Sequence, residues 1–225
     1  MVTVILSKHK RTHFLPEQIL AIESQTHKVD EILFDDSAKI GKGVWERFNL
    51  ARTAKNKFVC IIDDDTIPGK KYIESCINEF KIKEGVYGTK GVIFKSNSHY
   101  EGNYEEVGWY NPNSKTTQVD YCCHSWFFLK DWLEYFWRAK EVPFNYGEDM
   151  NLSFQLQKEG INTYVPPHPK NDKELWGSIK GREYGDDENS LWVSNPLNFR
   201  NNMFEYFNTK VNEGWKLLRD KTSLM

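Results

Sequence analysis

The first eighty residues alternate short apolar segments with segments of helical periodicity, and this alternation limits the folds open to the chain. Val2–Leu6, Glu31–Phe34 and Phe58–Ile62 are short runs rich in aliphatic and aromatic residues, as expected of buried parallel strands. An amphipathic segment follows each run, and the first of these segments has Pro16 near its start. Strands and helices in this order predict βαβ units on a parallel sheet, and therefore an α/β fold.

The rest of the chain is less regular. Further extended segments are predicted at Val86–Phe94, Val119–Leu129 and Ile161–Val165, and further helices at Asp131–Lys140, Gly147–Glu159 and Phe199–Leu218. Residues 170–190 are rich in Gly, Lys and Asp and have no periodicity, so we expect a mobile lid there. No internal repeat and no linker is evident, which predicts a single domain over residues 1–225.

Composition excludes several classes of protein. The 30 Lys and Arg residues against 32 Asp and Glu give a formal net charge of −2, which argues against a nucleic-acid binder. No apolar run approaches the roughly 20 residues that span a bilayer, and the apolar start is too short for a signal peptide. Cysteines at positions 60, 76, 122 and 123 fit no zinc pattern and predict reduced thiols. We therefore expect a cytoplasmic protein, in a reducing compartment, or one catalytic unit of a longer chain.

Three consecutive carboxylates, Asp63, Asp64 and Asp65, come directly after the third predicted strand. Ligands of open α/β sheets bind at the carboxyl ends of the strands. Asp63 and Asp65 face the same way on an extended chain, so they can share one cation, and all-oxygen ligands favour Mg²⁺ or Mn²⁺. The alternative is an acidic turn that only caps the next helix.

Two other interpretations of the acidic cluster fit less well. An EF-hand loop that begins at Asp63 would need a ligand at Ile67 and a glycine at Pro68. A haloacid-dehalogenase-type phosphatase would carry its Asp-x-Asp motif after the first strand, whereas this cluster follows the third. Gly185-Asp186-Asp187 imitates the later acidic motif of those phosphatases, so that class stays a distant alternative.

Several segments, in order along residues 2–165, resemble GT-A fold glycosyltransferases, especially the large family 2. The opening strand and the helix that ends in Ser24-Gln25-Thr26 match the start of those enzymes, and the next strand ends in paired aspartates. The segment FVCIIDDDTIPGKKYIES resembles their Asp-x-Asp segment, and YGEDMNLSFQLQKEG resembles their later Glu-Asp helix start. The tripeptide ERF ahead of the aspartates is similar to a feature of exostosin-like transferases.

The resemblance implies a GT-A, Rossmann-like fold, with a mostly parallel central sheet flanked by helices. It implies a nucleotide-sugar-binding half in residues 1–95, an acceptor-side half in residues 96–195 and a C-terminal helix in residues 196–225. The implied activity is a metal-dependent hexosyltransferase reaction with Mn²⁺ or Mg²⁺ as cofactor. A nucleotide-diphosphate sugar, with a UDP-sugar favoured, would be the donor, and a hydroxyl of a glycan or another molecule the acceptor.

The same resemblance assigns roles to individual residues. Asp35 and Asp36 would bind the nucleobase, and Ser7 and His9 would line its pocket. On the donor side the resemblance also implies Arg47 at the base or diphosphate, Asp63 at the ribose or sugar, and Asp64 alongside Asp65. Lys180 and Arg182 lie on the predicted lid, from which they would fold over the diphosphate. A solvated surface loop is an equal alternative for Lys180 and Arg182.

Metal and catalytic roles follow in the same way. Asp65 and Asp63 would ligate the metal, with His168 as a further ligand, although an exposed histidine is an equal alternative. Asp149, next to Glu148, would be the base that deprotonates the acceptor in an inverting transfer. In a retaining enzyme the two carboxylates would instead position the acceptor or stabilise the oxocarbenium-like centre. Because negative charge is favoured at a helix start, capping is the alternative for both.

Two other function classes remain open. A non-catalytic carbohydrate- or nucleotide-binding module would bind without turnover and would not need the three aspartates. A sugar-phosphate nucleotidyltransferase would need a Gly-rich, Arg-containing loop after the first strand, and Ser7–Thr12 contains no Gly. We rank the transferase first, then the binding module, the nucleotidyltransferase and the phosphatase.

Overall fold

The apolar segments at the start of the chain form neighbouring parallel strands. The computed structural model describes residues 1–36, 43–96, 103–194 and 196–222. In it, β1 (Val2–Ser7) lies between β2 (Glu31–Asp35) and β3 (Phe58–Ile62), and both pairings are parallel. Every residue of β1 is buried, as expected of a strand that is covered on both faces. The prediction of a parallel arrangement for these three strands is confirmed.

The second half of the chain extends the same sheet. β7 (Tyr121–Leu129) runs antiparallel between β3 and β4 (Gly85–Phe94). The far edge contains β5 (Tyr104–Gly108), β6 (Thr117–Val119) and β8 (Asn162–Val165). The main strand order is β2-β1-β3-β7-β4-β8-β6, and β5 also pairs with β4. β1, β2, β3, β4 and β8 share one direction, so the described sheet is mixed but mostly parallel.

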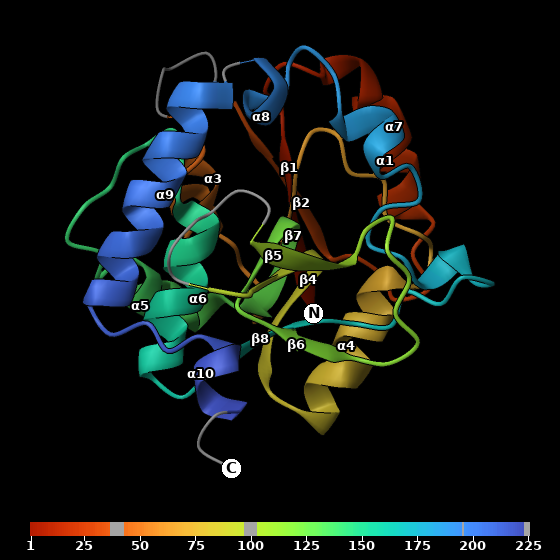
Figure 1. The fold of residues 1–225 in the computed structure, drawn as a ribbon. Coiled ribbons are helices and arrows are strands. Elements are labelled where there is room, and N and C mark those ends of the chain that lie inside the picture. Colours follow the sequence, from red (N-terminus) through yellow and green to blue (C-terminus); the bar gives the residue numbers. More distant parts are fainter. Residues whose placement is uncertain (37–42, 97–102, 195, 223–225) are drawn as a thin grey trace.

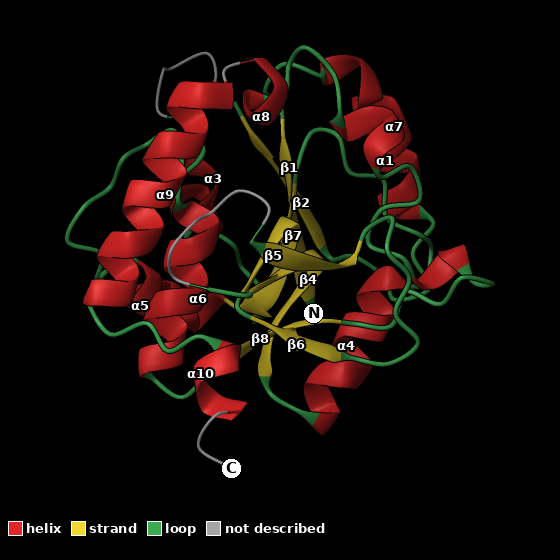
Figure 2. Ribbon diagram, in the orientation of Figure 1, coloured by secondary structure: helices red, strands yellow, loops and turns green. Residues whose placement is uncertain are grey.

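Helices cover both faces of the sheet (Figures 1 and 2). One side carries α3 (Glu46–Ala51), α5 (Leu133–Phe136), α6 (Glu148–Lys158) and α9 (Pro196–Asn212). The other side carries α1 (Leu15–Glu23), α4 (Tyr72–Ile82) and α7 (Arg182–Gly185). Short 3₁₀ turns occupy Thr12–Phe14, Lys130–Trp132 and Lys173–Leu175. The described chain is thus one α/β domain, as predicted at this level of detail.

Much of the aromatic content lies in the core between the sheet and the α3 side. Phe48 stacks on Phe136 with ring centroids 4.5 Å apart, and Trp126 meets Phe48 edge-on at 5.5 Å. Trp45 lies 5.0 Å from Phe136. All four side chains are almost completely buried. Offset and edge-on packing of aromatic rings stabilises a core by more than the burial of their surface area alone would.

The C-terminal helix is shorter than predicted. α9 ends at Asn212, and a separate helix, α10 (Leu218–Thr222), follows. Gly214 lies between them with φ of 101°, a conformation that glycine adopts readily and that ends a helix. Residues 223–225 of the predicted element lie outside the described residues. No helix in the described part of the chain is long and apolar enough to cross a membrane.

Residues 170–190, predicted as a lid, pack closely against the sheet over part of their length. Trp176, Gly177 and Ser178 are buried, and the backbone N–H of Ile179 donates to the carbonyl of Ile67 at 2.8 Å. A Cβ on Gly177 would lie 2.0 Å from Thr89 Oγ1, so only glycine fits there. This packing fixes residues 176–179 beside β4 and leaves residues 180–190 to lie over the carboxyl end of the sheet.

Candidate active site

A cavity of about 700 Å³ lies at the carboxyl ends of β1, β2 and β3. The strands bring Ser7, Asp35 and Asp63 to the same edge because parallel neighbours end side by side. The cavity lining gathers most of the residues predicted for the site: Ser7, His9, Asp35, Arg47, Asp63, Asp64, Asp65, Glu148, Asp149 and Arg182. Residues from both predicted halves of the chain therefore meet in one place.

Three of the predicted residues do not belong to this lining as far as the chain is described: Asp36, Lys180 and His168. Asp36 forms an ion pair with Lys8 at 3.8 Å. Lys180 pairs with Glu183 at 3.2 Å, on its own short turn. The donor-binding roles of Asp36 and Lys180 thus have no direct geometric support.

His168 has a structural role and not the predicted role as a metal ligand. Its side chain is fully buried, and burial lowers its pKa to about 4, so the ring is neutral. Nδ1 donates to the carbonyl of Pro166 at 2.8 Å, and Nε2 accepts from the backbone N–H of Gly177 at 2.9 Å. The lone pair that a metal would need is already used, and we do not retain His168 as a ligand.

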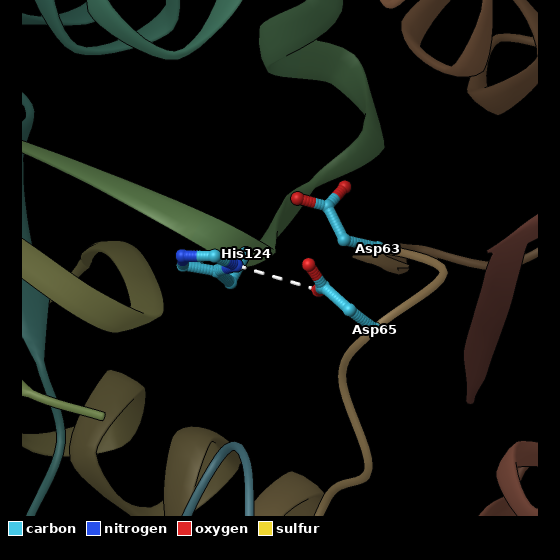
Figure 3. A group of neighbouring side chains, drawn as sticks. All are labelled: Asp63, Asp65 and His124. Atoms are coloured by element: carbon cyan, nitrogen blue, oxygen red, sulfur yellow. Dashed lines mark hydrogen bonds and ion pairs between the residues drawn. The ribbon is translucent and has the colours of Figure 1, made fainter. Parts of the chain in front are cut away.

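Asp63, Asp65 and His124 converge on one point, as Figure 3 shows. One ligand atom from each of the three lies within 4.8 Å of the others, and His124 Nδ1 is 3.4 Å from Asp65 Oδ1. A divalent ion with bonds of about 2.0–2.2 Å holds neighbouring ligand atoms about 3 Å apart, so the three side chains would close in slightly around a bound ion. Two carboxylates and an imidazole also suit Mn²⁺ chemically, so the residues present fit such an ion.

His124 reaches this point because β7 is irregular there. The register between β4 and β7 shifts between Gly88 and Lys90, and His124 has a φ of 68°. Its ring stacks on Trp109, with centroids 4.5 Å apart. Bulges and left-handed non-glycine residues concentrate at functional sites, where they redirect a side chain. The sequence does not mark His124 as a ligand, because the irregular register of β7 leaves no sign in the sequence.

Arg47 bridges the aspartate cluster to the start of α6. Its guanidinium forms a very short ion pair with Asp63 and donates to Glu148 Oε1 at 2.5 Å. It also lies over the Trp126 ring at 4.6 Å. Arg47 Nε and the Ser7 hydroxyl have no hydrogen-bond partner among the described atoms, although both residues line the cavity and are buried. Buried polar atoms of this kind are normally satisfied, and a ligand in the cavity would satisfy them.

Arg11 is a site residue that the sequence analysis missed. Its buried guanidinium contacts Asp64 at 3.0 Å, Asp65 at 3.5 Å and Asp187 at 2.5 Å. The basic run at residues 8–11, directly after the first strand, is the sequence signal by which Arg11 could have been found. Through Asp187, whose pKa is lowered by the hydrogen bond from Arg11, residues 181–190 are tied to the aspartate cluster.

Asp64 differs from its two neighbours in what it contacts. It accepts hydrogen bonds from the backbone N–H groups of Lys10 and Arg11, at 3.0 and 3.2 Å. It therefore holds the loop after β1 in place.

Burial favours a higher pKa for Asp65, but the hydrogen bond from His124 and the charge of Arg11 outweigh it and lower the pKa to about 2. Asp65 is thus ionised at neutral pH, as a metal ligand must be.

Asp149 lies buried at the first turn of α6. Gly147 precedes the helix with a φ of 77°, and a Cβ there would lie 2.8 Å from the Tyr206 ring. Burial, followed by the negative charge of Glu148, raises the pKa of Asp149 to about 8. Its Oδ1 also accepts from the backbone N–H of Met150 at 2.7 Å, so it takes part in capping the helix. The Asp149 carboxyl group can therefore both cap the helix and accept a proton.

Comparison with known proteins adds nothing to this geometry. No protein-family model matches the chain, and no curated protein matches it in a sequence search. The resemblance to GT-A glycosyltransferases therefore stays a prediction from short motifs.

Proposed function

We propose that this protein is a metal-dependent glycosyltransferase, which transfers a sugar from a nucleotide-diphosphate sugar to a hydroxyl of a glycan or other acceptor. A UDP-sugar is the favoured donor. The observation that carries the proposal is the convergence of Asp63, Asp65 and His124 in a cavity that also contains Asp149, a carboxyl group with a raised pKa. Paired perturbed carboxylates in one cavity are typical of catalytic sites.

The metal-binding side would serve the donor. A Mn²⁺ or Mg²⁺ ion held by Asp63, Asp65 and His124 would supply positive charge next to the departing diphosphate. Ser7, His9 and Asp35 line the neighbouring part of the cavity at the ends of β1 and β2, where they would contact the nucleoside. The Ser7 hydroxyl would gain the partner that it lacks among the described residues.

The α6 side would serve the acceptor. Asp149 would accept the proton of the acceptor hydroxyl as that oxygen attacks the anomeric carbon. The bond from that carbon to the diphosphate oxygen breaks, and its electron pair leaves with the nucleoside diphosphate. A raised pKa makes Asp149 a stronger base than an ordinary aspartate. Glu148 stays bound to Arg47 and so fixes the start of α6 relative to Asp63.

A thermal-shift panel tests the proposal directly. The protein is melted with UDP, GDP, CDP and ADP, and with their sugars, each with Mn²⁺ and with EDTA. A ligand at about 100 times its Kd stabilises by roughly 2.7 kcal/mol, which raises Tm by several degrees for a domain of this size. We expect one diphosphate to raise Tm only with Mn²⁺, and Asp65→Asn to abolish that shift while Asp131→Asn, at an exposed position, retains it.

The outcomes separate the alternatives. A shift that is equal in Mn²⁺ and EDTA, or that survives Asp65→Asn, would remove the metal from the proposal. A metal-dependent shift without sugar transfer or donor hydrolysis would favour the binding module. Release of phosphate from simple phosphomonoesters would favour the phosphatase, and a flat panel would contradict the transferase.

A further inference from the structure

Two residues with an unusual backbone conformation are in contact beside the candidate metal ligands. Among the described residues other than glycine, Trp109, His124 and Phe144 have a positive φ. Trp109, at 54°, directly follows β5, and His124, at 68°, lies in β7, yet their side chains meet. A positive φ is rare for a bulky side chain and persists only where the surrounding structure imposes it. The reaction proposed above gives a role to His124 and none to Trp109.

The Trp109 ring is the surface on which the His124 imidazole lies. The two rings are within 20° of parallel, and their centroids are 4.5 Å apart. The imidazole also points Nδ1 toward Asp65 Oδ1, as Figure 3 shows, at 3.4 Å. A hydrogen bond of that length is weak and directs the imidazole only loosely. The stack on Trp109 therefore fixes the plane of the His124 ring.

Trp109 is itself held by its neighbours. Gly108, directly before it, has a φ of 74°, and a Cβ there would lie 2.5 Å from the carbonyl oxygen of Thr89. The backbone N–H of Trp109 donates to that same carbonyl at 2.8 Å. The Lys90 ammonium lies over the Trp109 ring at 4.6 Å, and a Cβ on Gly185 would lie 2.9 Å from the edge of the ring. The corner after β5 and the chain at residue 185 thus keep the indole in one orientation.

We propose that Trp109 is a positioning residue, which holds the His124 imidazole toward Asp63 and Asp65 and so raises the affinity of the site for a divalent cation. Residues that orient a metal-binding histidine contribute to metal affinity without touching the ion. Trp109 is only 4% exposed, so little of its ring is left to contact a substrate directly. The inference rests on the proposed function for the cation, but the position of the imidazole is measurable without one.

The position of the imidazole is measured first, by NMR of the metal-free protein. A stacked indole shields the carbon-bound protons of the His124 ring and moves their signals upfield. The signal that is missing from His124→Gln identifies this residue among the 6 histidines of the chain. We expect Trp109→Leu to lose the upfield shift and Trp109→Phe, which retains an aromatic ring, to keep most of it. An unshifted signal in the unaltered protein would overturn the inference whether or not the variants fold.

Mn²⁺ affinity is measured next, by calorimetric titration of the same proteins. We expect Trp109→Leu to weaken Mn²⁺ binding by about tenfold or more, as is typical for residues that orient metal ligands, and Trp109→Phe to weaken it less. The double variant Trp109→Leu/His124→Gln should bind Mn²⁺ no more weakly than His124→Gln alone, because Trp109 then has no imidazole to orient. Losses that add in the double variant would show that Trp109 acts by another route, and would overturn the inference.

Trp132→Leu is the matched control for the loss of a buried indole. Trp132 is 8% exposed, packs against Phe80 with ring centroids 5.9 Å apart, and is not among the described residues that line the cavity. Its replacement should lower Tm but leave the Mn²⁺ affinity and the His124 signal unchanged. Equal losses of Mn²⁺ affinity in Trp109→Leu and Trp132→Leu would reduce the effect of Trp109 to general stability and overturn the inference.

The outcomes also separate the inference from the proposed function. Mn²⁺ binding that depends on Trp109, without any nucleotide-dependent rise in Tm, would support the inference and contradict only the transferase. A metal-dependent nucleotide shift that Trp109→Leu leaves intact, together with an unchanged His124 signal, would overturn the inference and leave the transferase standing. If the unaltered protein binds no Mn²⁺, the inference and the metal in the proposed function are both contradicted.

Discussion

Each of the two candidate metal carboxylates is paired with an arginine. Arg47 contacts Asp63, and Arg11 contacts Asp65. Adjacent carboxylates in a partly buried site repel one another, and these guanidinium groups offset that repulsion without any bound ion. The aspartate cluster is therefore compatible with a folded protein before a metal binds, and a metal would share Asp63 and Asp65 with the arginines.

His124 should contribute measurably to metal affinity. His124→Gln keeps a polar side chain but removes the imidazole, so we expect Mn²⁺ binding to weaken by about 10- to 100-fold, the range typical of altered metal-site partners. Calorimetric titration with Mn²⁺ gives the affinity. His13→Gln, at an exposed position, is the control. Equal Mn²⁺ affinity in both variants would exclude His124 as a ligand.

Asp149 should govern the rate of transfer and its pH dependence. Asp149→Asn preserves the shape of the side chain but removes the base, so kcat should fall by about 10²-fold or more while donor affinity stays constant. Because only the ionised carboxylate accepts a proton, kcat of the unaltered protein should rise with pH and level off above about 8. A pH–rate profile in both proteins measures this. A near-normal kcat in the variant would contradict the assignment.

The same carboxyl group should make stability depend on pH. The pKa of Asp149 is about 8 in the fold and about 3.9 in an unfolded chain, so folding binds a proton between these values. This contribution to stability is fully present below the unfolded pKa and is lost as pH rises through the folded pKa. Asp149→Asn should therefore gain Tm relative to the unaltered protein as pH rises from about 4 to 8. Asp131→Asn should show no such gain, and parallel curves for all three proteins would contradict the shifted pKa.

At the scale of elements, the sequence predicts the start of α6 but not the irregular backbone of β7 at His124. The start of α6 follows from Gly147 and the acidic residues after it, and the helix was predicted to within one residue at each end. The turn of β7 at His124 was not predicted, because it depends on the register between two strands that are distant in sequence. A regular β7 would alternate its side chains across the sheet and would place His124 differently.

The link between Arg11 and Asp187 should control the mobility of residues 180–190. Asp187→Asn weakens the ion pair while Arg11 keeps its contacts with Asp64 and Asp65. We expect trypsin to cut after Lys180 and Arg182 severalfold faster in this variant, because local opening becomes easier. Glu188→Gln, at the exposed neighbouring position, is the matched control. Equal cutting rates in the two variants would show that this ion pair does not restrain the segment.

The lid prediction is tested in the same experiment. A nucleoside diphosphate with Mn²⁺ should slow cutting across residues 180–190 if this segment closes over the donor. Residues 176–179 contain no Lys or Arg, so trypsin reports on this segment only through the sites at Lys180 and Arg182. Unchanged cutting at Lys180 and Arg182 with ligand would count against a lid.

For the whole molecule, the insertion of β7 between β3 and β4 decides how the chain folds. Residues 1–95 contain β1 to β4, but β3 and β4 meet only through β7, which comes from residues 121–129. The predicted nucleotide-binding half therefore depends on the other half for its central pairing. The lining of the cavity also includes Glu148 and Asp149, which lie beyond residue 95.

A fragment of residues 1–95 should consequently fail to fold by itself. Without β7 it would expose two unpaired strand edges and lose part of the aromatic core, including Trp126. We expect no cooperative unfolding of this fragment in denaturant, whereas the full chain should unfold in one transition. Circular dichroism during a urea titration distinguishes the two. A sharp transition in the fragment would show that the first half is an independent unit.

The local sequence determined the features that depend on neighbouring residues. Apolar runs and helical periodicity predicted β1, β2 and β3, and polar residues at the strand ends placed Ser7, Asp35 and Asp63 at one edge. These features follow from the period of side chains along a strand or helix and from the tendency of parallel strands to end together.

Only the tertiary structure decided which distant residues complete the site. Arg11, His124 and Asp187 come from three separate parts of the chain and meet at the aspartate cluster. The family resemblance implied a metal-binding role for His168, but its side chain is buried and both ring nitrogens hydrogen-bond to the backbone. Such contacts depend on strand order, register and loop packing, which result from the burial of the whole core and leave no local pattern in the sequence.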